Sequence, residues 1–555
     1  SNPKTATEFT YGQVYNQVTD LRSYDYGGTA LLKSTRTQYQ NSTNYTSRHI
    51  FNLPLVVEIF ASDNATRVSR AEFQYDGQTL ANTPGVIMHD DAFNPHFEPV
   101  LIPGDCYYDC TNAPIGEPCD YVCDPDWWYT PYNSSTDYRG NLTQETTYGD
   151  AVSLGSAVIE TNRYDMTGNI ITQTNSCCQQ TSTTFTVDSF YGYQVAETRG
   201  SPTDGFHQVK ISASYDFNTG LVLTTTDADG RPSQATYDPA TLRMASRTMP
   251  TGAHTDYAYD DTGLSVTETK YLQSHPTHTT IASQTIRLMN GRGDVRQEKA
   301  LGAGGVWDLV DTVYDSMGRV SQESNPYRSG GTIQWATTTY DALNRVISVQ
   351  SADGSIIQNF YNETTRPSVA SSSPGETTRV QDAWGRERWS REDASGRIVE
   401  VVEPDPSGTG SVATNGLVTS YAYNTNDDLV LVTQGAQTRS FKYDSLRRLI
   451  AQKSAEASAK LNDAGVYVGS GTWSDVFTYD DRSNMVSHTD ARGVKTIFNY
   501  NGDPLNRLQS ISWDTSGFGD TANPVLAAPT ATFQYRTKSS APQLLDVEQV
   551  LADLL

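Results

Sequence analysis

Cysteine is the residue type whose spacing in this chain points most directly to chemistry. Four cysteines follow the pattern C-x3-C-x8-C-x3-C and two more are adjacent: Cys106, Cys110, Cys119, Cys123, Cys177 and Cys178. Thiolates so close together either form disulfides or hold a zinc ion, although structural zinc sites usually use C-x2-C knuckles. We expect disulfides, which form outside the cytoplasm, with free thiols or a zinc site as alternatives and the pairing left open.

Histidines and carboxylates, the usual acid–base groups of enzymes, show no catalytic arrangement in the sequence. The only close histidine pair, His275 and His278, lies in a Pro/Thr loop without a third zinc ligand. Adjacent carboxylates such as Asp260-Asp261 are typical of solvated turns, and sequence neighbours do not define glycosidase geometry. G-x-S-x-G, P-loop and H-E-x-x-H motifs are absent. We therefore expect no enzyme, no cofactor and no metal site.

Aromatic residues close to the first four cysteines are the best candidates for ligand contact. Trp127, Trp128 and Tyr129 are consecutive. Exposed rings could stack on sugars, whereas buried rings would plug or cap the fold, and we favour the structural role. The tripeptide 292–294 (RGD) and the segment 227–230 (DADG) resemble a cell-attachment motif and the start of a calcium loop. Both fall where turns are expected, and the second lacks the later calcium ligands, so we interpret them as turns.

A repeated tyrosine–aspartate unit is the strongest signal in the sequence. Each copy has Tyr-Asp, a short turn containing Gly, Asn or Arg, and then a β-rich run. The clearest copies begin at Tyr164-Asp165, Tyr215-Asp216, Tyr237-Asp238, Tyr259-Asp260, Tyr314-Asp315, Tyr340-Asp341, Tyr443-Asp444 and Tyr479-Asp480. Where copies, including degenerate ones such as Tyr423-Asn424 and Tyr500-Asn501, are adjacent, they are about 20–26 residues apart, which fits two strands of about 5–7 residues with two short turns. Each unit therefore predicts one β-hairpin, and neighbouring hairpins must pack together.

The residue types of the unit explain why it should form a hairpin. Asp accepts hydrogen bonds from its own downstream backbone and Gly tolerates positive φ, so D-x-x-G marks a turn. The segments that follow alternate polar and apolar residues, as half-buried strands do. A Tyr at a fixed place in each unit could stack on its neighbours, which predicts an aromatic ladder.

With these Y-D-x-x-G-R-like units and intervening D-x-x-G-R half-steps, the sequence resembles the RHS/YD-repeat family. That family includes bacterial Rhs polymorphic toxins, the C-subunits of insecticidal toxin complexes and the teneurins. The matching units cover most of residues 160–510. The resemblance implies an all-β fold, in which a long antiparallel sheet of tandem hairpins winds in a spiral. Such a sheet would form a hollow shell or solenoid-like body, which in the toxin members encloses a C-terminal cargo.

The sequence departs from the toxin members of that family in one respect. Their shells end in a self-cleaving segment rich in Asp, Pro and Gly, followed by a variable toxin. The nearest candidate here, residues 404–408 (PDPSG), lies mid-chain and is followed by more repeats, so we expect a loop. An enclosed C-terminal cargo, further repeats of a longer precursor and copies of the chain itself all remain open as partners.

Composition divides the chain into four expected parts. Residues 1–100 are β-rich with degenerate repeats, and residues 101–149 are a Cys/Pro/Trp-rich insertion loop. Residues 150–514 are the repeat body, and residues 515–555 are a linker-like tail. Within these parts, residues 452–466 are the best candidate for a short helix, and residues 543–555 could form a terminal amphipathic helix.

Charge and hydropathy limit the possible partners. The net charge of −24 repels phosphate backbones, which argues against nucleic-acid binding. No run of about 20 apolar residues occurs, so we expect no membrane-spanning helix. Together with the expected disulfides, these features favour a secreted or cell-surface protein. The sequence predicts a non-catalytic, secreted β-shell or scaffold, with an adhesin for carbohydrate or cell-surface glycans, or a self-assembling filament subunit, as the alternative.

Overall fold

The computed structural model describes residues 5–83, 138–176, 179–200, 208–272, 280–519, 522 and 524–535. It also describes the backbone of two short paired strands, β6 (Cys106–Asp109) and β7 (Asp120–Cys123). The six cysteines, Trp127 to Tyr129, the pair His275 and His278 and the tail 543–555 fall outside the described side chains. The predictions made for them remain predictions.

A single antiparallel sheet of 36 strands forms almost the whole described structure. Its first strands are β1 (Ala6–Tyr11), β2 (Val18–Tyr24), β3 (Leu31–Tyr39), β4 (Pro54–Phe60), β5 (Arg67–Tyr75), β8 (Leu142–Asp150), β9 (Gly155–Tyr164), β10 (Ile170–Asn175), β11 (Gln180–Phe185) and β12 (Gln194–Gly200). Within the described residues, helical structure is limited to α1 (Thr43–Thr46) and the 3-10 turns η2 (Val187–Ser189) and η4 (Ala303–Gly305).

The middle of the sheet consists of the hairpins that the repeats predict. These strands are β13 (Gln208–Tyr215), β14 (Val222–Thr226), β15 (Pro232–Tyr237), β16 (Met244–Thr248), β17 (His254–Asp260), β18 (Ser265–Tyr271), β19 (Ile281–Met289), β20 (Val295–Leu301), β21 (Trp307–Tyr314), β22 (Val320–Ser324), β23 (Tyr327–Arg328), β24 (Trp335–Tyr340), β25 (Val346–Gln350) and β26 (Ile356–Tyr361).

The last part of the sheet continues the same pattern. Its strands are β27 (Glu376–Gln381), β28 (Glu387–Glu392), β29 (Ile398–Glu403), β30 (Leu417–Tyr423), β31 (Leu429–Gln434), β32 (Gln437–Tyr443), β33 (Leu449–Lys453), β34 (Asp475–Tyr479), β35 (Met485–Thr489), β36 (Lys495–Asn499), β37 (Ser510–Asp514) and β38 (Ala531–Thr532). The predicted all-β class and the long antiparallel sheet of tandem hairpins are confirmed.

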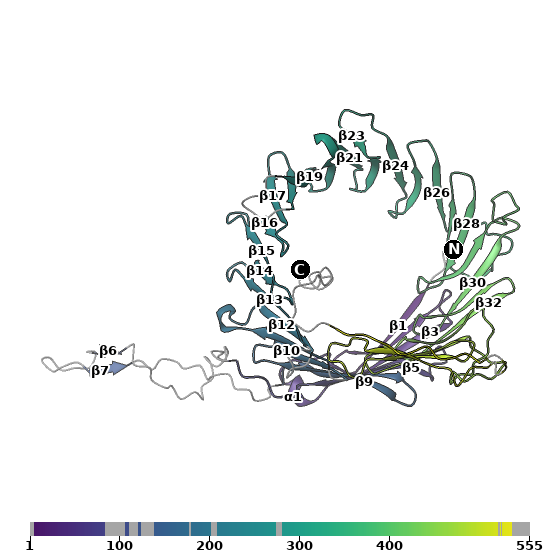
Figure 1. Cartoon of the computed structure of the whole chain (residues 1–555), viewed down its shortest axis with the longest axis horizontal. Helices are drawn as coiled ribbons and strands as arrows, with labels where there is room; N and C mark the ends of the chain where they lie inside the picture. Colours follow the sequence, from purple (N-terminus) through teal and green to yellow (C-terminus); the bar gives the residue numbers. More distant parts are fainter. Residues whose placement is uncertain are drawn as a thin grey trace.

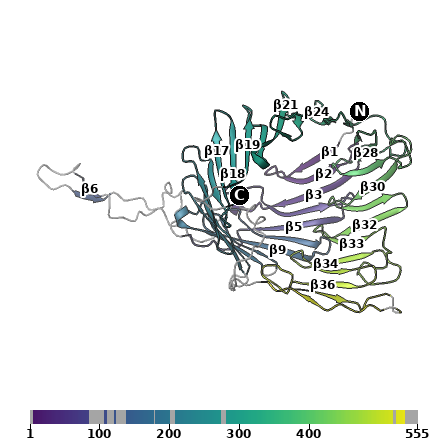
Figure 2. The ribbon, with the colours of Figure 1, turned by 45° about the horizontal axis from the view of Figure 1, so that its top comes forward.

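The sheet winds into an open spiral rather than a closed barrel. Figure 1 shows the strands following one another around a ring. After a full turn, strands β28 to β33 arrive beside the first strands β2 to β9, and Figure 2 shows these two sets next to each other. Because it is one layer, the sheet has only small clusters of buried apolar side chains, such as Trp389 with Val402 and Val412.

One sequence-based prediction about secondary structure is wrong. Residues 452–466 do not form a helix: β33 ends at Lys453, and the chain continues as a loop to β34. Leu461 explains the difference, because its fully buried side chain packs with Trp473 and Val476 while its backbone pairs with Tyr467 and Trp473 in isolated bridges. This tertiary contact outweighs the helix propensity of the Ala-rich run.

Candidate functional site

The repeat turn is a compact hydrogen-bonded unit, and Asp315 shows how it works. One carboxylate oxygen of Asp315 accepts the backbone N–H groups of Met317 at 2.9 Å and Arg319 at 3.0 Å. The other oxygen accepts Arg319 Nε at 2.8 Å. These bonds, led by the backbone N–H of Arg319, lower the pKa of Asp315. Gly318, at φ 84°, closes the turn in the left-handed region that favours glycine.

The Arg of each turn also joins its hairpin to the next hairpin. The Arg319 guanidinium lies 4.5 Å from the centre of the Tyr340 ring, a cation–π contact. Its Nη1 donates to Asn344 Oδ1 at 2.8 Å. The same stacking joins Arg345 to Tyr361 at 4.2 Å and Arg448 to Tyr479 at 5.0 Å. Arginine, the residue that followed the turn in the sequence pattern, is therefore the link between consecutive units.

Tyrosine hydroxyls form a second set of links between neighbouring strands. The Tyr340 hydroxyl donates to the Val320 carbonyl at 2.8 Å, and the Tyr479 hydroxyl donates to the Leu449 carbonyl at 2.8 Å. Burial raises the pKa of Tyr479, which keeps its hydroxyl protonated as a donor. The prediction of an aromatic ladder needs correction at these units, since each ring faces an Arg of the preceding turn. Tyr193 and Tyr215, stacked at 5.1 Å, are a pair of the predicted kind.

Successive turns of an antiparallel sheet alternate between its two edges, which we name rim A and rim B. Rim A carries the turns that follow the Tyr-Asp units of the repeat body and the related Tyr423-Asn424 unit, including residues 216–220, 238–242, 315–318, 341–344, 424–428 and 444–448. Rim B carries the turns in between, including residues 25–30, 61–66, 150–155, 227–230, 351–354 and 382–385. The repeat spans two strands, so that the Tyr-Asp turns from Tyr164 to Tyr479 all lie on rim A.

A polar seam joins rim A of the second turn of the spiral to rim B of the first. The Ser445 backbone N–H donates to the Gly149 carbonyl at 2.9 Å, and Ser445 Oγ accepts the Ala151 N–H at 3.0 Å. Asn426 Nδ2 donates to the Val68 carbonyl at 3.3 Å. These contacts, the ion-pair network at Lys33 and the carboxylate cluster beside Tyr26 together form what we call the seam. The seam is the candidate functional site.

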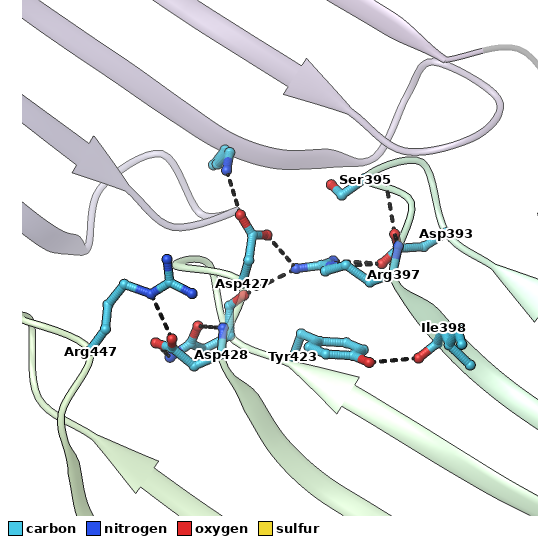
Figure 3. Close-up of polar contacts among 10 residues, drawn as sticks. Asp393, Ser395, Arg397, Ile398, Tyr423, Asp427, Asp428 and Arg447 are labelled. Atoms are coloured by element: carbon cyan, nitrogen blue, oxygen red, sulfur yellow. Dashed lines mark hydrogen bonds and ion pairs between the residues drawn. The ribbon is translucent and has the colours of Figure 1, made fainter. Parts of the chain in front are cut away.

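An ion-pair network forms the middle of the seam (Figure 3). Lys33, at the start of β3, donates to Asp427 Oδ2 at 3.0 Å across the seam. Asp427 Oδ1 accepts Arg397 Nη1 at 2.7 Å, and Arg397 bonds Asp393 within its own turn. The side chains of Lys33 and Asp427 are about a third exposed, so solvent screens their attraction.

At the start of the seam, Tyr26 of the first turn lies among carboxylates of the second. Burial raises the pKa of Tyr26, and the charges of Glu376, Asp393 and Glu392 raise it further. Glu376 and Glu392 are direct neighbours across β27 and β28. Burial, followed by the charges of Glu376 and Asp393, also raises the pKa of Glu392. The seam thus combines an ion pair at Lys33 with a cluster of like-charged carboxylates beside Tyr26.

The turns singled out by motif are structural, as predicted. In the 292–294 tripeptide, Arg292 Nη2 pairs with Asp294 Oδ2 at 2.7 Å within the β19–β20 turn. In segment 227–230, one Asp227 oxygen accepts the backbone N–H groups of Asp229 and Arg231. Asp260 caps its own turn, and residues 404–408 form a loop.

Two arrangements of side chains were not predicted from the sequence. The seam joins residues hundreds of positions apart, and no local pattern marks Lys33 or Gly149. The second is a chain of contacts in the β16–β17 hairpin, where Thr248 Oγ1 lies 2.8 Å from His254 Nδ1 and His254 Nε2 lies 2.9 Å from Asp256 Oδ1. Its imidazole is only 4% exposed, so we interpret this chain as part of the sheet.

Comparisons with known proteins find likeness in structure but not in sequence. No family model and no curated protein matches the chain. A solved chain of TcdB2-TccC3 matches with a TM-score of 0.56 and 14% identity, covering 90% of this chain and 28% of that one. A chain of the Photorhabdus luminescens Tc holotoxin pore, with the TccC3 mutation D651A, gives a TM-score of 0.60 and 12% identity, covering 93% and 32%.

A third solved chain, TcdB2-TccC3 without its hypervariable C-terminal region, has a TM-score of 0.55 and 13% identity, covering 90% and 29%. This chain therefore spans about a third of the length of the solved chains that it matches. At such low identity the likeness concerns the fold, which is that of Tc toxin complexes and agrees with the family resemblance of the repeats. In the described part of the chain, no helix has the length and apolar character needed to cross a membrane.

Proposed function

We propose that this chain is a non-catalytic, secreted scaffold that forms part of a hollow β-shell in a larger extracellular assembly. The seam carries the proposal. A single-layer sheet that joins its own successive turns edge to edge, through Lys33, Asn426 and Ser445, has the geometry of a wall. The repeat turns stabilise that wall, because their Asp, Arg and Tyr groups are bonded to one another and to the backbone.

Likeness to the Tc toxin complexes supports an assembly role, since the matching chains are parts of multi-subunit toxins. The proposal is that this wall, like a shell, encloses a cargo or meets further subunits. The expected disulfides support a secreted location. Alkylation of the purified protein before and after reduction, read by mass spectrometry, tests that part: six thiols free without reduction would contradict secretion through an oxidising compartment.

Cryo-electron microscopy of the protein purified from its natural source tests the shell itself. The proposal predicts a hollow particle whose interior holds density beyond the sheet, with a matching polypeptide found by mass spectrometry. An interior without density, in a particle without a second polypeptide or a second copy, would overturn it.

One exposed aromatic group favours the alternative of a glycan-binding adhesin. Trp384 is 81% exposed at a rim B turn, with the Arg386 guanidinium 5.0 Å from its ring centre. An exposed indole can stack on a sugar ring. Glycan-array binding that disappears in Trp384→Ala but persists in the control Leu343→Ala would favour the adhesin over the shell.

A further inference from the structure

A small hollow lies on the sheet where strands β14, β15 and β16 run side by side. It holds about 40 Å³ of space for water-sized molecules, and Leu223, Tyr237 and Met244 contribute to its wall. Ala235 lies directly opposite Arg247 across β15 and β16, and its single methyl group leaves space that a larger residue would fill. The hollow is therefore largely apolar and has one cation in its lining.

Arg247 is the feature of this hollow that points to a ligand. It is half-buried, and within the described residues its guanidinium has neither a hydrogen bond nor an ion pair. The residues directly opposite it are Ala235 and Thr255, which carry no charge. Burial raises the pKa of Tyr237, and the charge of Arg247 opposes that rise. A cation that loses part of its water without gaining a partner costs free energy, which an anion from outside would offset.

Other arginines within strands of this sheet lie opposite a carboxylate. Arg287 is directly opposite Glu298 and donates to it at 2.9 Å. Arg391 is directly opposite Glu400 and donates to it at 3.1 Å. With 64 acidic and 40 basic residues, the chain has carboxylates to spare, yet none lies opposite Arg247. The carboxylate that would complete this pair can therefore come from a bound molecule.

Two hydroxyl groups add hydrogen-bonding capacity to the lining. Thr225 and Ser233 are directly opposite each other on β14 and β15, and both line the hollow. In the part of the chain that the structure describes, neither hydroxyl has a hydrogen-bond partner. Ser233 is only 6% exposed, so bulk water does little to replace a partner. A hydroxyl can donate to a carboxylate oxygen.

We propose that this hollow binds a carboxylate group carried on a short aliphatic chain. The carboxylate would accept hydrogen bonds from Arg247 and a hydroxyl, while its methylene groups fill the space beside Ala235. A space of about 40 Å³ corresponds to about three water molecules, at about 10–15 Å³ each, so only the end of a ligand enters. A free short-chain acid and the glutamate side chain of a polypeptide both end in this way. The site goes beyond the proposed scaffold function and does not depend on it, because it lies within one chain.

Methyl NMR of the full chain tests the inference, because the chain has only seven methionines and Met244 contributes to the hollow. Propionate has the same atoms as the end of a glutamate side chain. At constant ionic strength, it should shift the Met244 signal in a saturable way in the millimolar range, since few atoms are bound. Uncharged propionamide should not. Met317, 69% exposed at a distant turn, is the internal control whose signal should stay in place.

Three variants separate the cation from the hollow. Arg247→Gln should weaken propionate binding at least about tenfold, because it removes the charge-assisted hydrogen bonds. Ala235→Leu should abolish the shift by filling the hollow while Arg247 stays. The matched control Arg287→Gln removes an arginine that is already paired with Glu298, and it should bind propionate like the parent chain. Circular dichroism of each variant checks that the sheet is intact.

A Met244 signal that does not move, that propionamide moves equally, or that responds fully in Arg247→Gln would overturn the inference. Glutamate blocked at both backbone ends distinguishes the two sources of the carboxylate. Binding as tight as that of propionate supports a polypeptide side chain, and loss of binding restricts the site to free acids.

Discussion

The seam turns and the free turns of rim A share one backbone design and differ in their contacts with the first turn of the spiral. In both, an Asp or Asn caps the turn, an Arg reaches the next unit, and a Tyr hydroxyl bonds a strand carbonyl, as at Arg397 with Tyr423 and Arg345 with Tyr361. The tip residue varies in both regions: it is Ser395, Asn426 or Leu446 in the seam turns, and Met317 or Leu343 in two turns of the free rim. The repeat therefore fixes the hairpin and leaves the tip free to define what the rim contacts.

Acid should have the largest effect, because it removes the Asp caps of several turns together. Hydrogen bonds led by the Thr66 hydroxyl lower the pKa of Asp63 to about 2, and those led by backbone N–H groups of the turn lower the pKa of Asp315 and Asp341. A lowered carboxyl pKa contributes stability above the unfolded value near 4, which is lost as the pH falls through the folded value. We expect cooperative unfolding between about pH 4 and pH 2, followed by circular dichroism. A chain fully folded at pH 2 would contradict this.

Among the single changes, Arg448→Leu should cause the largest loss of unfolding free energy. It compares a seam turn with a free turn. Arg448 and its partner Asp444 have side chains only 13% and 10% exposed, and Arg448 also bonds the Asp480 carbonyl. Losing this Arg leaves a nearly buried carboxylate unpaired, which we expect to cost about 2–4 kcal/mol of unfolding free energy. The matched change Arg345→Leu, at a pair 36% and 22% exposed, should cost about 1 kcal/mol. Urea denaturation that shows equal losses would contradict the difference in burial.

Tyr→Phe changes test whether the repeat unit is the same in both regions. Tyr423 bonds the Ile398 carbonyl at 2.8 Å in the seam region, and Tyr340 bonds the Val320 carbonyl at 2.8 Å on the free rim. Removing either hydroxyl should lower the unfolding free energy by about 0.5–1.5 kcal/mol, since one hydrogen bond to a carbonyl is lost. Urea midpoints of the two variants should agree. A loss confined to one region would break the idea of a common unit.

Glu392→Gln should change the pH response of the seam. A carboxyl with a raised pKa contributes stability at a pH below its unfolded value, near 4.5, and loses it as the pH rises through the folded value. Between pH 7 and about pH 5 the seam near Tyr26 should therefore become better protected as the pH falls. Hydrogen exchange of residues 25–30 should show this trend in the parent chain and a weaker trend in the variant. The same trend in both would contradict the role of Glu392.

Asp427→Asn should have the smallest effect on stability, and Asn344 on the free rim is the residue with which to compare it. Asn344 occupies the equivalent place on the free rim and accepts Arg319 as Asp427 accepts Arg397. The change therefore keeps the Arg contact and removes the charge that faces Lys33. We expect a loss of up to about 1 kcal/mol that shrinks at high salt, measured by urea denaturation at two salt concentrations. A loss independent of salt would contradict an ion pair.

The sequence predicts the hairpins, but it does not predict which strands meet after one full turn of the spiral. Tyr-Asp spacing and Asp/Gly turn chemistry are local, and so they predict the strands and the turns. Lys33 and Asp427 are 394 residues apart, and Ala151 and Ser445 are 294 residues apart. Their proximity depends on how many strands complete one turn, which follows from small twists added over the whole sheet. The loop at Leu461 was mispredicted for a similar reason, since Trp473 and Val476 decide its conformation.

Residue-resolved hydrogen exchange at two turns tests the account most directly. The Ser445 N–H donates to the Gly149 carbonyl of the first turn of the spiral. Ala342 has the same place in the turn that starts at Asp341, and no partner across the spiral is described for its N–H. If the second turn of the sheet rests on the first, Ser445 should exchange slowly and Ala342 fast in the same sample. Equally fast exchange at both would show that the second turn of the sheet does not rest on the first.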